Sequence, residues 1–558
     1  MSGPYHPMEG VVYAAAERAR FYLDAGVWEP LTLGDALRRT AAHAPERTAY
    51  VCAERRISYA ELDDASDWLA IGLRKLGLQL HDRAMFQMGT GIDTVIALFA
   101  CFKAGVIPVC SIPQFRELEI QTLAELTQPK GYFVQPDAGG RFDLLAFANS
   151  MAERLDIPYV IASGNPSVPG VHSLETLCQS TPENAQLDTS GEFGCEDVVA
   201  FQLSGGSTGV PKVIPRFHGE YQGHVRAWCD RYGMRDGDIG IWALPILHNA
   251  GMMFSIVRPV LYGATTVLMP QWDVARYFEM IEREKVQHAF TIGPHAPAIA
   301  AYPNAGQHDL SSLQSLFTLI GAESIEAATG VCSINMFGIT EGLVLTGTPD
   351  ASAALRHGTI GMTCSAYDEV RLLQPGTDNE VQLGQIGELC FRGPSSLRGY
   401  YAAPDINAAS FTPDGFFRTG DLVRAQVIDG RTAYSFEGRM RDNINRGGEK
   451  FGTEDVEQLI ARHPDILDGK VVAMPDEVYG EKACAFLIAS GGRPLPSVRE
   501  LGEFLMSQGL AKYKLPERIE ACDAFPVTRV GKLDRAALRA LIARKIAVES
   551  QHAPDSQS

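Results

Sequence analysis

The sequence lacks any long hydrophobic run. No stretch approaches the roughly 18 consecutive apolar residues that a membrane-spanning helix requires. The first residues, MSGPYHPMEGVVYAAAERAR, also lack the basic segment followed by an apolar segment that is typical of a signal peptide. We therefore expect a cytoplasmic protein without a membrane partner.

Clustered cysteines and an excess of positive charge are missing as well. The eleven cysteines form no CxxC pair and no Cys/His cluster, which favours free thiols over a zinc site or a disulfide framework. Lysine and arginine number 49 against 67 aspartate and glutamate residues, giving a net charge of −18. Because nucleic-acid binding needs a basic stripe, we expect no nucleic-acid partner. An anionic ligand would need isolated cations placed locally.

What is present indicates a large globular protein of the α/β class. The 558 residues exceed the usual size of one domain, and 46% of them are hydrophobic. From about residue 31 to residue 270, short β-rich runs alternate with helical stretches, as in AMFQMG, IDTVIALFACFKAG and VIPVCSI. This alternation predicts α/β architecture.

The character of the chain changes near residue 439. The short segments VEQLIARHP, KVVAMP, KACAFLIAS and VRELGEFLMSQG predict a compact α+β module. We therefore expect a large domain over 1–438, a hinge over 439–442 and a small domain over 443–545. Residues 546–558, with few apolar anchors, are expected to be a frayed tail.

A glycine-rich loop, LSGGSTGVPK, spans residues 203–212. The flanking segments VVAFQLS (198–204) and KVIPRF (212–217) are predicted to be strands. Backbone amides and hydroxyls in such a loop can form a concave cradle for an anion. A Walker loop would place Ser or Thr after the lysine and open a helix, so that class is excluded. A surface hairpin with glycines at its turn is the alternative for this loop taken alone.

Five motifs together resemble the adenylate-forming superfamily of acyl-CoA synthetases, peptide-synthetase adenylation domains and luciferases. They are FQLSGGSTGVPKVIPR, FGITEG (337–342), GFFRTGDL (415–422), GRMRDNINRGGEKF (438–451) and VTRVGKLDR (527–535). The residues of the segments QLSGGSTG, INRGGEK and YKLPERIE are most similar to those of the aryl-acid branch, the 2,3-dihydroxybenzoate- and salicylate-AMP ligases. The resemblance implies an α/β fold: a large body of two α/β sheets and a distorted β-barrel, followed by a small mobile α+β domain.

The resemblance also implies a nucleotide site for ATP and Mg²⁺. Ser207, Thr208 and Lys212 would hold the β- and γ-phosphates, Thr340 the α-phosphate, and Glu341 the metal. Lys532 would bridge the attacking carboxylate and the α-phosphate. Without the motifs, each of these residues has a simpler interpretation. Glu341 would be an ordinary surface acid, Asp421 would cap a turn, and Lys532 would be a solvent-exposed lysine. The further residues implied for ATP and AMP binding are Ser204, Gly205, Gly206, Gly209, Gly321, Ala322, Glu323, Asn335, Met336, Phe337, Gly338, Asp421 and Arg439. Of these, the segments 321–323 and 335–338 would lie against the adenine, and Asp421 and Arg439 would contact the ribose.

The segment LPILHNAGMMF is implied to line the acid pocket. In the aryl branch an Asn after His contacts the ring 2-hydroxyl, and His248, also a candidate catalytic residue, precedes Asn249 here. Phe254 stands where a small polar residue reads the 3-position, so an unpaired 3-hydroxyl would cost about 1–3 kcal/mol. Salicylate or a related 2-substituted benzoate is therefore favoured over 2,3-dihydroxybenzoate. The remaining pocket candidates are Ala250, Gly293, His295, Ile320, Gly321, Met336 and Val344.

After adenylation, the resemblance implies rotation of the small domain about Arg441 and transfer to a pantetheine thiol. Gly447, Gly448, Glu449 and Lys450 would face the thiol, although the two glycines read alone are a hairpin turn. The acceptor is coenzyme A, which we favour, or the phosphopantetheine of an aryl carrier protein that serves siderophore or peptide synthesis. A fatty- or alicyclic-acid CoA ligase and a non-catalytic nucleotide-binding relative are the other hypotheses. We expect a monomer or homodimer. The segment 322–336 is shorter than in the family pattern, and nothing in the sequence assigns a function to this difference.

Overall fold

The computed structural model describes residues 3–164, 166–182, 185–204, 211–291, 295–319, 321–440, 443–490, 493–526 and 533–552. The chain forms two compact units. The larger comprises Met1–Pro113, Leu123–Ser204 and Val213–Gly438. The smaller comprises Arg439–Ser558 with two short earlier segments.

A nine-stranded sheet forms one part of the larger unit, in the order β16-β15-β14-β13-β12-β10-β11-β1-β2. Its inner strands pair in parallel, whereas β2, β15 and β16 pair antiparallel at the two edges. The short apolar runs of the inner strands suit burial on both faces. The strands are β1 (Thr48–Cys52), β2 (Arg55–Ser58), β10 (Ile239–Trp242), β11 (Thr265–Leu268), β12 (His288–Phe290), β13 (Ser315–Thr318), β14 (Ser333–Gly338), β15 (Val344–Thr346) and β16 (Met362–Thr363).

A second sheet of seven strands follows the order β7-β6-β5-β3-β4-β8-β9. The pairs from β7 through β8 are parallel. The strands predicted on either side of the glycine-rich loop are confirmed as β8 and β9, with the expected bounds. The strands are β3 (Arg83–Gln87), β4 (Ile107–Val109), β5 (Gly131–Val134), β6 (Tyr159–Ala162), β7 (Val171–Ser173), β8 (Val198–Ser204) and β9 (Lys212–Phe217).

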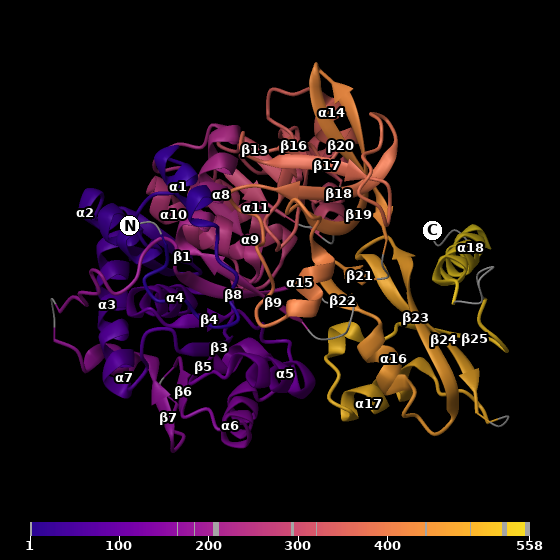
Figure 1. Ribbon diagram of the computed structural model, residues 1–558, viewed down its shortest axis with the longest axis horizontal. Helices are drawn as coiled ribbons and strands as arrows, with labels where there is room; N and C mark the ends of the chain where they lie inside the picture. Colours follow the sequence, from indigo (N-terminus) through magenta and orange to yellow (C-terminus); the bar gives the residue numbers. More distant parts are fainter. Residues whose placement is uncertain are drawn as a thin grey trace. The chain divides into compact units, whose positions relative to one another are not determined.

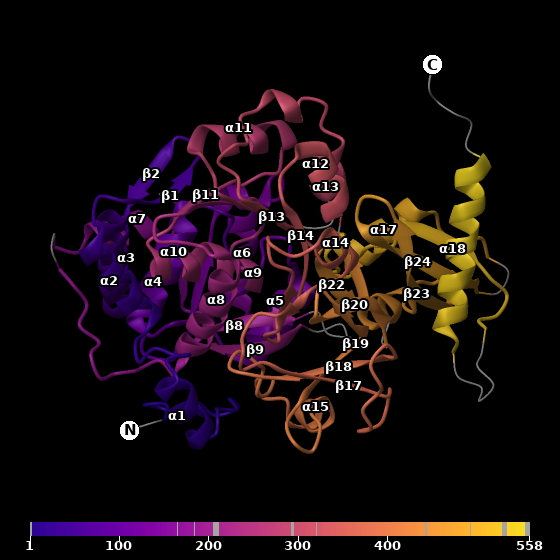
Figure 2. The same ribbon diagram turned by 90° about the horizontal axis from the view of Figure 1, so that it is seen from above.

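Helices α2, α3 and α4 pack on one another beside β1 (Figure 1 and Figure 2). Capping boxes begin α2 at Thr32 and α3 at Ser58, and α3 ends at Gly77 in the left-handed conformation. Nearly every residue of α4 is buried, as its continuous apolar sequence predicts. No described helix combines the length and apolarity that crossing a membrane requires.

The helical segments of the larger unit are α1 (Ala16–Asp24), α2 (Leu33–His43), α3 (Tyr59–Leu76), α4 (Ile92–Ala104), α5 (Glu117–Thr127), η1 (Pro136–Gly139), α6 (Leu144–Arg154), α7 (Leu174–Gln179), α8 (His218–Tyr232), α9 (Asn249–Gly251), η2 (Met252–Val257), α10 (Arg258–Tyr262), α11 (Val274–Glu284), α12 (His295–Ala300), η3 (Ala305–Gln307), α13 (Ala322–Thr329), α14 (Ala353–Gly358) and α15 (Pro404–Ser410). The segment η2 is a π-helix. This form is rare in proteins overall, but where it occurs it is often at a functional site.

The region expected to be a distorted β-barrel is a four-stranded antiparallel sheet in the order β17-β18-β19-β20. The edge strand β20 is joined at Tyr434 by backbone hydrogen bonds to Ile360 and Gly361, just before β16 of the nine-stranded sheet. Its strands are β17 (Glu369–Leu373), β18 (Ile386–Arg392), β19 (Phe417–Ile428) and β20 (Arg431–Arg439). A cluster including Phe391, Tyr400 and Phe417 packs on this sheet.

The smaller unit is an α+β module with a five-stranded sheet. Its elements are β21 (Asn443–Arg446), β22 (Glu449–Gly452), α16 (Glu454–Ile460), β23 (Ile466–Asp476), β24 (Gly480–Ala489), α17 (Val498–Ser507), η4 (Lys512–Lys514), β25 (Arg518–Ala521) and α18 (Arg535–His552). The expectation of a frayed tail from residue 546 is wrong as far as His552, because α18 continues to that residue. Ile546 packs with Leu538 and Ile542, and Glu549 pairs with Arg518 at 2.7 Å.

Candidate active site

The predicted nucleotide and acid residues follow the carboxyl ends of neighbouring parallel strands. Strands β10, β12, β13 and β14 are adjacent in the nine-stranded sheet and run in one direction. Asn249 comes after β10, His295 after β12, Gly321 after β13 and Thr340 after β14. Ligands of open α/β sheets bind outside the carboxyl ends of the strands. The topology therefore collects at one edge groups that the sequence presents separately.

The predicted adenine segments are joined by a hydrogen bond. Gly321 precedes α13 with a φ of +89°, a conformation that favours glycine, and Ala322 N donates to Asn335 Oδ1 at 3.1 Å. Asn335 Nδ2 donates to the carbonyl oxygen of His357 at 2.6 Å. Glu323 is exposed in the first turn of α13. The two segments thus form one connected surface next to β14.

The turn after β14 fixes the predicted phosphate and metal residues. The Glu341 carbonyl oxygen accepts from Leu397 N at 2.7 Å, and its Oε1 accepts from the Tyr400 hydroxyl at 3.0 Å. Gly342 has a φ of +111°, and a Cβ there would lie 1.7 Å from the carbonyl oxygen of Ser395. The main chain at this turn therefore has no room for another residue type.

The donor set at Glu341 suits Mg²⁺. The side chain is half-buried, and a carboxylate supplies the hard oxygen that this ion prefers. Among the described residues, no group of three or more His, Cys, Asp or Glu could enclose a metal. One carboxylate with phosphate oxygens and water is the usual way proteins bind Mg²⁺ beside a nucleotide, so Glu341 fits that role.

A buried charge cluster, missed by sequence reasoning, supports Thr340. Arg216 Nη1 donates to the Thr340 carbonyl oxygen at 2.7 Å, and Arg216 Nη2 lies 2.7 Å from Glu220 Oε1. Glu220 Oε2 also lies 3.4 Å from Arg398 Nη1. Burial raises the pKa of the Glu220 carboxyl to about 7, while the charges of Arg216 and Arg398 act in the opposite direction. Arg216 lies in β9 and Glu220 in α8, so their four-residue spacing is not a helical pair and gave no signal in the sequence.

The amide of Asn249 is buried and hydrogen-bonded. Asn249 is 5% exposed, and its Oδ1 accepts from the Tyr221 hydroxyl of α8 at 2.9 Å. Asn249 Nδ2 lies 3.8 Å from Met253 Sδ. His248 is exposed before α9, and Ala250 is half-buried. Tyr221 is the second functional candidate that sequence reasoning missed.

Aromatic rings surround Phe254. Phe254 is 4% exposed, and its ring lies parallel to that of Phe290 with centroids 4.8 Å apart. Its centroid is 4.3 Å from that of Trp228. Met336 and Val344 are also buried and belong to the same hydrophobic cluster. This part of the predicted pocket is therefore densely packed and apolar.

His295 stacks on Trp272, with ring centroids 3.7 Å apart and an interplanar angle of 5°. Burial lowers the pKa of the His295 imidazole to about 4, so the ring is neutral at physiological pH. Its Nδ1 has no hydrogen-bond partner among the described residues. A neutral imidazole with an unpaired nitrogen can still supply a polar contact.

Other predicted nucleotide residues are located only in part. Asp421 is 5% exposed on β19, with its backbone N donating to Thr419 Oγ1 at 3.0 Å. Ser204 ends β8, half-buried Lys212 begins β9, and Arg439 ends β20. The side chains of Arg439 and Lys450 are not described. Nine predicted residues lie outside the described ranges: Gly205, Gly206, Ser207, Thr208, Gly209, Gly293, Ile320, Arg441 and Lys532.

The predicted thiol-facing segment is a two-residue hairpin in the smaller unit. Gly447 and Gly448 join β21 to β22 with φ values of +61° and +100°. Gly447 N donates to the Tyr479 carbonyl oxygen at 2.9 Å, and Gly448 N donates to Asn445 Oδ1 at 3.0 Å. Glu449 begins β22. The turn geometry alone accounts for both glycines, and the thiol role remains a prediction.

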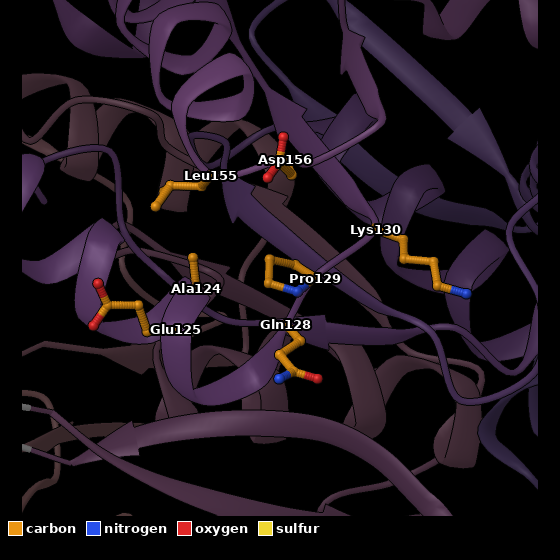
Figure 3. A pocket seen from close by; sticks show the side chains of 7 residues that line it. All are labelled: Ala124, Glu125, Gln128, Pro129, Lys130, Leu155 and Asp156. Atoms are coloured by element: carbon orange, nitrogen blue, oxygen red, sulfur yellow. The ribbon is translucent and has the colours of Figure 1, made fainter.

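A hollow of about 370 Å³ lies elsewhere in the larger unit (Figure 3). It is lined by residues at the carboxyl ends of α5 and α6 and by residues that directly precede β5. This is the amino end of β5, the opposite edge of a parallel sheet from the one that binds ligands. The hollow is therefore not the active site. Its lining residues are Ala124, Glu125, Gln128, Pro129, Lys130, Leu155 and Asp156.

Comparison with known proteins identifies the class that this fold and site define. The family model described as "AMP-binding enzyme" matches residues 37–401, and "AMP-binding enzyme C-terminal domain" matches residues 455–532. The chain is an adenylate-forming ligase and belongs to the AMP-binding enzyme family.

Its relatives include enzymes that activate aryl acids. It is 37% identical to 2,3-dihydroxybenzoate-AMP ligase of Bacillus subtilis, over 95% of this chain and 97% of that protein. It is 32% identical to 2-hydroxy-7-methoxy-5-methyl-1-naphthoate–CoA ligase of Streptomyces carzinostaticus, over 94% and 95%. The apo structure of Mycobacterium smegmatis MbtA is 29% identical, with a TM-score of 0.70 and coverage of 95% and 98%. The predicted resemblance to the aryl-acid branch is confirmed.

Proposed function

We propose that the protein activates salicylate or a related 2-substituted benzoate with ATP and then transfers the acyl group to a pantetheine thiol. A carboxylate oxygen attacks the α-phosphorus, and the bond from that phosphorus to the bridging oxygen of pyrophosphate breaks. The thiol sulfur then attacks the acyl carbon of the adenylate, loses its proton and displaces AMP. The product is a thioester.

The chain's own residues divide this work. Thr340 contacts the α-phosphate, Asp421 accepts hydrogen bonds from the ribose hydroxyls, and Lys532 neutralises charge between the carboxylate and the α-phosphate. Glu341 would hold Mg²⁺, which would offset charge on the phosphate oxygens. Positioning and electrostatic stabilisation supply the catalysis.

The single observation that carries the substrate is the buried amide of Asn249 beside an apolar wall. Asn249 is 5% exposed, and its Nδ2 faces the sulfur of Met253, a weak acceptor. A ring 2-oxygen is a better partner for this N–H. The rings of Phe254 and Phe290 offer no polar atom to a 3-hydroxyl. These features support salicylate over 2,3-dihydroxybenzoate.

Coenzyme A is the proposed acceptor. The apolar environment of Phe254 departs from the aryl-acid branch that begins siderophores, and an aryl–CoA ligase is among the relatives. An aryl carrier protein is the second candidate, favoured by the 37% identity to 2,3-dihydroxybenzoate-AMP ligase. Both acceptors end in the same thiol, so product analysis must separate them.

Pyrophosphate exchange with a panel of acids tests the first half-reaction. We expect exchange with salicylate, weaker exchange with 2,3-dihydroxybenzoate and none with a fatty acid. The Lys532→Ala variant should bind ATP but lose exchange. Exchange with a fatty acid and none with salicylate would overturn the aryl-acid proposal.

Mass spectrometry tests the acceptor. The enzyme is incubated with salicylate, ATP, Mg²⁺ and coenzyme A, and we expect salicylyl-CoA. Release of the adenylate without any CoA thioester would contradict the coenzyme A proposal and favour the carrier protein.

A further inference from the structure

Tyr221 occupies a junction between the two halves of the active site. Its hydroxyl donates to Asn249 Oδ1 at 2.9 Å, and its ring lies 4.8 Å from the guanidinium carbon of Arg216. Arg216 in turn donates to the Thr340 carbonyl oxygen at 2.7 Å. Tyr221 is fully buried in α8, the helix that begins directly after β9. One rigid segment thus contacts both the acid motif and the phosphate motif.

The hydrogen bond from Tyr221 decides which end of the Asn249 amide is engaged. An amide side chain offers an acceptor oxygen at one end and two N–H donors at the other. Burial raises the pKa of the Tyr221 phenol, so it remains protonated and able to donate. The oxygen end is therefore held by the phenol, and the N–H end faces away from it toward the Met253 sulfur.

The two ends of an amide distinguish an ortho-hydroxyl from an ortho-amine. The phenolic proton of salicylate is engaged by the adjacent carboxylate, which leaves the lone pairs of the 2-oxygen pointing outward as acceptors. In 2-aminobenzoate one N–H is engaged in the same way, and the second N–H points outward as a donor. An N–H of Asn249 complements the first acid and opposes the second.

We propose that Tyr221 is a positioning residue that fixes the Asn249 amide with its N–H toward the acid, and thereby selects 2-hydroxy over 2-amino benzoates. Tyr221 does not touch the substrate in this assignment and acts only through Asn249. The inference rests on the proposed function, because it assumes that Asn249 reads the 2-position of an aromatic acid.

The test is the ratio of kcat/KM for salicylate to kcat/KM for 2-aminobenzoate, measured by pyrophosphate exchange. We expect Tyr221→Phe to lower this ratio about 10-fold, as one hydrogen bond of about 1–1.5 kcal/mol implies. Part of the change should be a gain with 2-aminobenzoate, because the freed amide can turn its oxygen toward the ring. Both acids are measured on one preparation, so the folded fraction cancels in the ratio.

Tyr59→Phe is the matched control. Tyr59 is also fully buried, and its hydroxyl oxygen lies 2.7 Å from the carbonyl oxygens of both Pro259 and Ala264, to one of which it donates. Its loss removes buried phenol hydrogen bonds without touching Asn249, so the ratio should stay at the wild-type value. A ratio that falls equally in both variants would make the Tyr221 effect merely structural and overturn the proposal.

Asn249→Asp provides an independent variant should Tyr221→Phe fail to fold. Asp at 249 presents an acceptor oxygen to the ring even with Tyr221 in place, so the ratio should again fall. An unchanged ratio in Tyr221→Phe, or in Asn249→Asp, overturns the assignment of the amide. Wild-type enzyme inactive with both acids would instead overturn the proposed function, which keeps the two failures distinct.

Discussion

Arg216 donates a hydrogen bond from Nη1 to the carbonyl oxygen of Thr340 at 2.7 Å. The bond joins β9, which leaves the glycine-rich loop, to the turn that carries the predicted α-phosphate and metal residues. Arg216 is fully buried, so this carbonyl is held by a cation that water does not screen. Arg216 therefore fixes the position of the Thr340 carbonyl oxygen in the turn predicted to contact phosphate.

Replacing Arg216 by Met should separate stability from activity. Removing Arg216 should cost about 3–5 kcal/mol, because Glu220 loses its 2.7 Å partner and must either stay charged with only Arg398 beside it or take up a proton. The Arg216→Met/Glu220→Gln variant should recover part of the free energy of unfolding in urea titrations. Pyrophosphate exchange should remain at least about 10-fold low in both variants, since the Thr340 bond is lost. Full exchange in the double variant would contradict the positioning role of Arg216.

Two glycines of the FGITEG motif should respond differently to alanine. A Cβ at Gly342 would lie 1.7 Å from the Ser395 carbonyl oxygen, so Gly342→Ala should lose more than about 4 kcal/mol of stability or fail to fold. The nearest atom to a Cβ at Gly338 is 3.8 Å away, so Gly338→Ala should change stability by less than about 1 kcal/mol. Thermal unfolding measures both. Equal effects would show that the packing at Gly342 is not the constraint.

Phe254→Ser should lower the stability of the protein and supply a polar partner for the 3-hydroxyl of 2,3-dihydroxybenzoate. Truncating a side chain that is 4% exposed and stacked on Phe290 costs about 3–5 kcal/mol. The new hydroxyl should raise pyrophosphate exchange with 2,3-dihydroxybenzoate relative to salicylate by about 5- to 30-fold. Phe254→Ala opens the same space without a hydroxyl and serves as the control. A ratio raised equally by both variants would attribute the selectivity to volume alone.

Stability at acid pH should depend on Glu326 of α13. Its carboxylate accepts from Ser333 N at 2.8 Å and pairs with Arg356, and these contacts lower its pKa from 4.5 to about 2. The ionised form therefore stabilises the fold above about pH 4.5, and this contribution is lost as the pH falls toward 2. Allowing for solvent screening, it amounts to about 1–2 kcal/mol.

Urea unfolding of Glu326→Gln at pH 6 and at pH 3 measures this contribution. The variant should be less stable than the wild type at pH 6, and the difference should shrink by pH 3. Glu323, exposed in the same helix, gives the control Glu323→Gln, which should follow the wild-type pH curve. A pH-independent difference for Glu326→Gln would assign its effect to packing.

Local patterns in the sequence predicted the elements whose causes are local. The strands on either side of the glycine-rich loop have the expected bounds because each is a continuous buried run. The hydrophobic runs of the smaller unit likewise form α16, β23, β24 and α17. The continuation of α18 was missed because its contacts are not local: Glu549 pairs with Arg518, which is 31 positions away.

The active-site motifs could be recognised in the sequence, whereas the residues that hold them in position could not. Tyr221 and Asn249 are 28 positions apart, and Arg216 and Thr340 are 124 apart, so only the folded sheet brings each pair together. The order of strands in the four-stranded sheet likewise depends on strand pairing, which no alternation of apolar residues determines. Sequence patterns therefore predicted which groups carry the chemistry, and tertiary packing determines what orients them.

The connection from β13 to β14 is close to the minimum length, so it can be lengthened but not shortened. Helix α13 and its flanks complete the crossover within residues 319–332, and parallel neighbours need about a dozen residues to be joined. Deleting residues would pull Ala322 away from Asn335 and break the tie between the adenine segments. Gly330 at the end of the helix has open space around it, so extra residues can bulge outward there. We therefore expect length changes in this segment to be tolerated only as additions.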